Sequence, residues 1–143
     1  MNKINNKCLR ILKQISITQL LSIVFAIIGE LYLRLLINHD WLFTNIILLS
    51  VGIIFLTILY TSLIYFFLEG KWINIALIFI PYIIYFFIVS IKSTHFFPMH
   101  TDPNDYGVGI LGLFIMFCQC MSVLISSIVG THLNKERCKL KQR

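Results

Sequence analysis

Four long apolar runs constrain this chain more than any other feature. They cover about residues 15–37, 41–68, 72–91 and 107–132, and among them only the first contains Asp, Glu, Lys or Arg. A helix needs about 20 consecutive, mostly apolar residues to cross the hydrocarbon core of a bilayer. Each run is long enough, so the sequence predicts four transmembrane helices.

The overall composition argues against an ordinary water-soluble domain. Hydrophobic residues make up 58% of the chain and charged residues 13%, whereas soluble domains average about 45–50% and about 25%. A chain of 143 residues is expected to form one domain. We therefore expect residues 1–143 to form a single integral membrane domain of the all-α class, a polytopic transmembrane four-helix bundle.

Basic residues gather at the two ends of the chain and predict its orientation. The tails 1–14 and 133–143 hold most of the Lys and Arg, and the turn "EGK" adds Lys71, whereas the segment 92–106 holds only Lys92. Connections rich in Lys and Arg usually face the cytoplasm. We expect cytoplasmic N- and C-termini and an outer loop at 92–106. Short connections make sequential neighbours antiparallel, which predicts an up-down-up-down bundle.

The basic tails also indicate the partners. The formal net charge is +6, but the charges flank the apolar runs in short segments, which favours contact with anionic lipid over binding of nucleic acid. We expect the protein in the cell membrane, with another membrane protein or a second copy of the chain as a protein partner. The abundance of Ile, Asn, Lys and Phe is typical of an AT-rich genome and favours a bacterial source.

Small and polar residues recur at three- and four-residue steps along the last run. With Met116 and Val123 between them, they are Gly109, Gly112, Gln119, Ser126 and Gly130. Such steps place residues on one helix face, and helices in lipid associate through small and polar residues. We expect this stripe to pack against the other helices. The alternative is that it lines a polar cavity.

Glu30 and Arg34 are the two charged residues inside the first run. A charged residue at the centre of a membrane helix costs about 2.5–3.5 kcal/mol on insertion scales. The i, i+4 spacing with the acid first is the favourable order for a helical ion pair. We expect a structural ion pair that fixes helix packing. The alternative is that Glu30 binds a cation or exchanges a proton.

Six potential metal ligands lie on the expected outer side of the membrane. They are His39 and Asp40 in the first connection, and His95, His100, Asp102 and Asp105 in or near the 92–106 loop. The two loop histidines are five residues apart, which differs from the i, i+4 spacing of helical zinc pairs. Asp-Pro and Asn favour a turn, and an Asp directly before a helix can cap it. We expect a turn and a helix cap, with a metal or proton role as the alternative.

The four cysteines predict no cofactor. Cys118 and Cys120 are two residues apart and point in different directions on a helix. Cys8 and Cys138 lie in the two basic tails. We expect reduced thiols and no bound metal.

The sequence contains no motif of nucleophilic, zinc-dependent or phosphate-binding catalysis. We therefore expect a non-enzymatic accessory, regulatory or immunity-type membrane partner. One alternative is a small ion- or proton-coupled transporter or channel that uses Glu30. The other is a membrane-embedded enzyme that uses the outer His and Asp residues.

Overall fold

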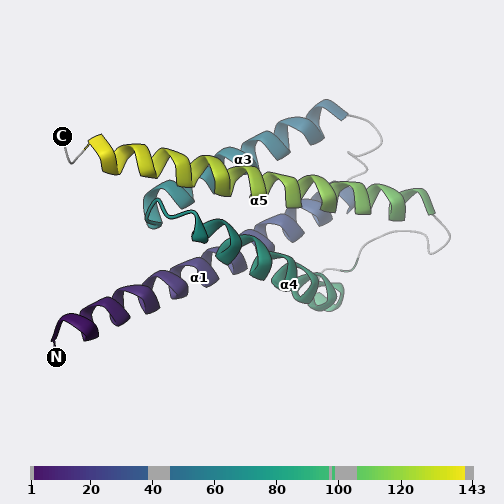
Figure 1. The fold of residues 1–143 in the computed structure, drawn as a ribbon. Helices are drawn as coiled ribbons and strands as arrows, with labels where there is room; N and C mark the ends of the chain where they lie inside the picture. Colours follow the sequence, from purple (N-terminus) through teal and green to yellow (C-terminus); the bar gives the residue numbers. More distant parts are fainter. Residues whose placement is uncertain (1, 39–45, 97, 99–105, 141–143) are drawn as a thin grey trace.

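The computed structural model describes residues 2–38, 46–96, 98 and 106–140. Within them the chain is helical and has no strand: α1 (Asn2–Asn38), α3 (Ile46–Phe67), α4 (Ile73–Phe96) and α5 (Tyr106–Leu140) (Figure 1). All four of these helices are long and apolar enough to cross a membrane. The predicted all-α class, with four helices of membrane-spanning length and composition, is confirmed.

The helices extend beyond the apolar runs. α1 begins at Asn2 and α5 ends at Leu140, so most of both basic tails is helical. Leu, Lys, Arg, Gln and Glu are strong helix formers, which explains why the helices continue past the apolar segments. α4 also continues to Phe96, which places residues 92–96 of the expected outer loop in the helix.

α1 packs most extensively on α4, and the hydrogen bonds between them show that the two helices run in the same direction. Near their N-terminal ends, Gln14 donates a hydrogen bond to Asn74 Oδ1 at 2.7 Å. One turn or more further along, Ser22 Oγ donates to the carbonyl of Ile78 at 2.9 Å. Polar side chains therefore join these two helices at several levels, as expected for association in lipid.

α3 packs most extensively on α5 in the same way. The hydroxyls of Thr57 and Ser122 lie 2.7 Å apart, and Ser126 Oγ donates to the carbonyl of Thr57 at 3.0 Å. A Cβ atom added to Gly130 would lie 2.8 Å from Ile64 Cγ2. Only glycine allows α5 to approach α3 so closely here.

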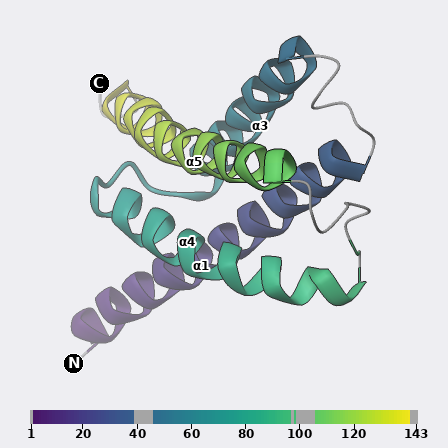
Figure 2. The same ribbon diagram turned by 90° about the vertical axis from the view of Figure 1, so that its right-hand side faces the viewer.

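The closest packing partners are thus not neighbours in the sequence. In the described part of the chain, α3 and α4 follow one another through residues 68–72 but do not pack together. The two pairs are joined by α1, which contacts α3 and α5, and by α4, which contacts α5. The helices cross near their middles and splay apart toward their ends (Figures 1 and 2).

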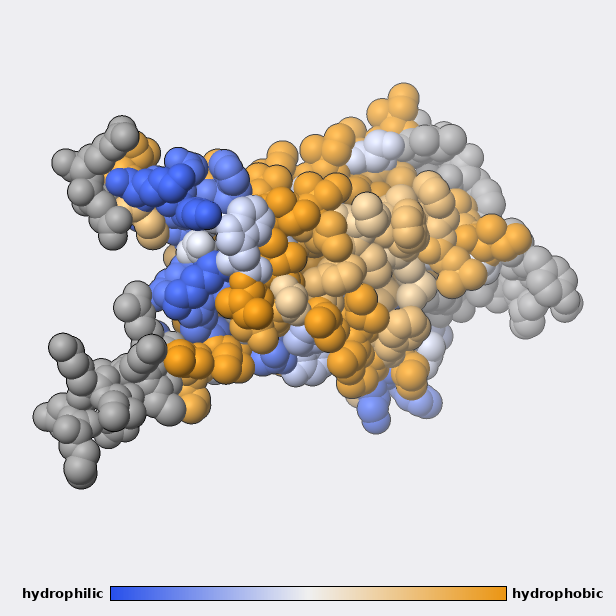
Figure 3. Space-filling model, viewed as in Figure 1, coloured by the Kyte–Doolittle hydropathy of each residue, from blue (hydrophilic) through white to orange (hydrophobic). Residues whose placement is uncertain are grey.

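Aromatic side chains fill the crossing region. Phe25 and Tyr60 have ring centroids 4.3 Å apart, and Tyr82 and Phe86 have centroids 5.7 Å apart. All four are essentially fully buried. The outer surface is also apolar across its middle, where it forms a broad hydrophobic band. Hydrophilic residues lie over the C-terminal part of α5 (Figure 3). This surface fits a lipid environment.

The turn after α3 is fixed by α5. Asn134 donates hydrogen bonds to the carbonyls of Tyr65 (3.1 Å) and Leu68. A Cβ atom on Gly70 would lie 2.5 Å from the backbone nitrogen of Lys135. The last carbonyls of a helix lack partners within the helix, so Asn134 satisfies groups that α3 alone leaves open.

Candidate functional site

The candidate site lies between α1 and α4, where Glu30 and Arg34 form a buried ion pair. Arg34 Nε lies 2.7 Å from Glu30 Oε1, and the side chains are 3% and 2% exposed. Ser93 on α4 donates a second hydrogen bond to the same carboxylate oxygen at 2.8 Å. Arg34 also donates to the carbonyl of Ser90 at 3.3 Å. The pair therefore links α1 to α4 through hydrogen bonds with Ser90 and Ser93.

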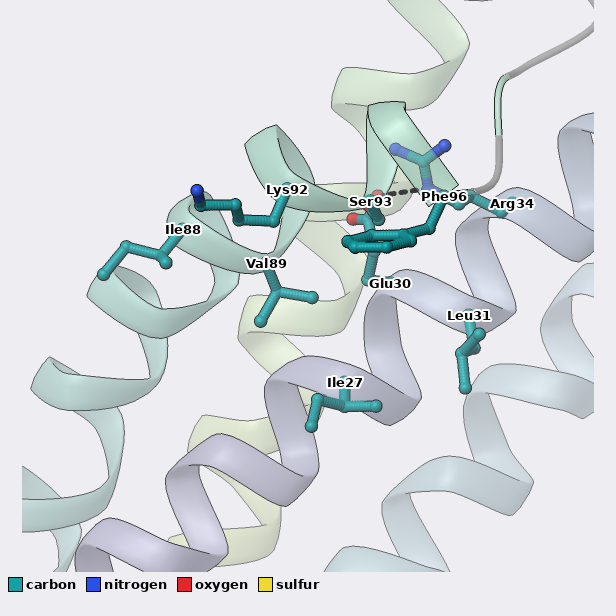
Figure 4. A pocket seen from close by; sticks show the side chains of 9 residues that line it. All are labelled: Ile27, Glu30, Leu31, Arg34, Ile88, Val89, Lys92, Ser93 and Phe96. Atoms are coloured by element: carbon teal, nitrogen blue, oxygen red, sulfur yellow. Dashed lines mark hydrogen bonds and ion pairs between the residues drawn. The ribbon is translucent and has the colours of Figure 1, made fainter.

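A cavity of about 270 Å³ opens beside this pair. Figure 4 shows the side chain of Glu30 rising from α1 toward Ser93 on α4, and the ammonium of Lys92 directed away from the ion pair. The other walls are apolar and come from the same two helices. They are Ile27, Leu31, Ile88, Val89 and Phe96. The cavity is thus an apolar groove, and the charged atoms of Glu30 and Arg34 are buried behind its wall.

One carboxylate oxygen is left over in this arrangement. Glu30 Oε2 is buried and has no hydrogen-bond partner among the described residues, whereas Oε1 accepts two hydrogen bonds. A buried acceptor without a donor carries a free-energy cost of about 1–3 kcal/mol, and more when it is charged. Glu30 therefore retains capacity for one further donor.

A second polar group lies deeper in the bundle, around Gly29. Gln119 Nε2 donates to the carbonyl of Gly29 at 2.8 Å. Gln119 Oε1 and the hydroxyl of Tyr82 are buried without partners among the described residues, and both lie within 3.4 Å of the position a Cβ on Gly29 would take. This group joins α1, α4 and α5 through the backbone of Gly29.

The stripe on α5 divides into two parts. Gln119, Ser126 and Gly130 are buried against other helices. In contrast, a Cβ atom on Gly109 or Gly112 would meet no described atom within 4 Å. Gly109 is exposed and Gly112 is partly exposed, so neither makes a close contact with the described part of the other helices.

One of the six expected outer-side ligands lies in the described part of the chain, so the structure does not test whether they come together. His95 lies exposed in the last turn of α4. The other five candidates lie outside the described residues; they are His39, Asp40, His100, Asp102 and Asp105. Among the residues that are described, no three His, Cys, Asp or Glu side chains cluster as metal ligands would. Cys118, Cys120 and Cys138 are free thiols.

A larger hollow lies at the opposite end of α1. It measures about 510 Å³ and is lined by Lys13, Gln14, Ile17, Phe66, Phe67 and Glu69. Two of its polar groups are already engaged, because Lys71 bonds Gln14 at 3.0 Å and Glu69 at 2.8 Å. The groove beside Glu30 is the stronger candidate for a site.

Sequence reasoning placed Ser93 and Lys92 in the outer loop. It therefore missed that both line the cavity beside Glu30. Helical continuation of α4 could have been inferred from the helix-compatible residues that follow Ile91, but their pairing with α1 could not. Neither a protein-family model, nor a curated protein, nor a solved structure matches the chain.

Proposed function

We propose that the four helices cross the cell membrane in an up-down-up-down arrangement with both basic ends in the cytoplasm. The distribution of Lys and Arg supports this orientation. So do two contacts at the same end of the molecule. Lys135 lies over the ring of Trp72 at 5.5 Å, and Arg137 lies over Tyr65 at 5.2 Å. Aromatic and basic side chains favour the headgroup level, where they contact anionic lipid.

Within this membrane the chain acts as a non-enzymatic partner of another membrane protein. The observation that carries this proposal is the state of Glu30. Its charge is matched by Arg34 at 2.7 Å, and the residue is 1% exposed. A transport carboxylate must exchange its cation or proton with water, whereas a sealed, paired carboxylate serves to fix how the helices pack.

The beginning of α5 is the surface that fits a partner helix. Gly109 and Gly112 lie on one side of the helix and meet nothing in the described structure. Small residues allow the backbones of two membrane helices to approach closely. An uncovered pair of this kind fits either a helix of another membrane protein or the same segment of a second copy.

A flux assay separates this proposal from transport. The purified chain is reconstituted into liposomes, and an internal pH dye follows proton movement under an imposed potential. We expect no flux above protein-free liposomes, and no change with Glu30→Gln. Proton or cation flux that disappears in Glu30→Gln would overturn the proposal in favour of a transporter.

Photo-crosslinking tests the surface directly. A photoreactive amino acid replaces Gly112 in the cell that expresses the chain, and a matched variant carries it at Ile125, which is 45% exposed further along α5. We expect a protein adduct from position 112 and only lipid adducts from position 125. Equal patterns from the two positions would remove Gly112 from any specific interface.

A further inference from the structure

We draw no further inference here: the strongest candidate, the apolar groove between α1 and α4 beside Glu30, has its charged atoms buried behind the wall, and nothing in the structure shows what covers it.

Discussion

Replacing Arg34 by methionine tests whether the Glu30–Arg34 pair holds α1 against α4. The substitution keeps an unbranched apolar stem but leaves the Glu30 carboxylate buried without its cation. Both side chains are at most 3% exposed, and their closest atoms are 2.7 Å apart. Removing one partner of a buried ion pair costs about 3–5 kcal/mol, whereas an exposed pair contributes about 0–1 kcal/mol. We expect the larger cost.

The double variant Glu30→Leu/Arg34→Met separates loss of the pair from exposure of a lone charge. Replacing a buried pair by apolar residues of similar volume is often neutral or stabilising. We therefore expect the double variant to recover most of the stability that Arg34→Met loses. Unfolding in mixed micelles, titrated with sodium dodecyl sulfate and followed by circular dichroism, measures both changes.

The chain supplies its own control pair. Lys139 and Glu136 also lie 2.7 Å apart, but their side chains are 61% and 47% exposed. Lys139→Met should leave the unfolding curve unchanged within error, because water screens such a pair. If Arg34→Met shifts the curve no more than Lys139→Met does, the pair is not the structural link described here. A double variant as unstable as the single one would show that the loss does not come from a lone buried charge.

Four further substitutions test other contacts in the same unfolding assay. Gly130→Leu places a side chain where Ile64 lies within 3 Å of the added Cβ, so we expect the free energy of unfolding to fall by about 1–3 kcal/mol. The control Gly112→Leu places its side chain in open space and should leave that free energy unchanged. Equal losses would contradict the close approach of α5 and α3. Asn134→Ala removes the donors to the carbonyls of Tyr65 and Leu68 and should cost about 1–2 kcal/mol, so an unchanged curve would argue against this cap. Ser126→Ala deletes a single hydroxyl contact between helices and should cost only about 0.6 kcal/mol; a loss of several kcal/mol would show that this contact was underestimated.

The existence of the helices could be predicted from the sequence because their signal is local. An apolar run of about 20 residues must satisfy its own backbone hydrogen bonds in lipid, and only a helix does so within one segment. The pairing of Glu30 with Arg34 is local in the same sense, because one turn of α1 brings both side chains together.

The arrangement of the helices could not be predicted in the same way. Short connections limit which ends lie near each other, but they do not determine that α1 packs on α4 and α3 on α5. That choice depends on matches between distant residues, such as Gln14 with Asn74 and Thr57 with Ser122. The place of Ser93 in the site could not be predicted either, because its hydrogen-bond partner Glu30 is 63 positions away in the sequence.

Labelling of cysteines in intact cells tests the membrane arrangement most directly. Cys138 is exposed near the end of α5, and His95 is exposed at the end of α4, so one variant keeps Cys138 as its single thiol and the other carries His95→Cys alone. A membrane-impermeant maleimide added from outside should modify position 95 at once, and position 138 only after the cells are permeabilised. Immediate modification of Cys138, with position 95 protected until permeabilisation, would contradict the orientation from which the proposed function proceeds.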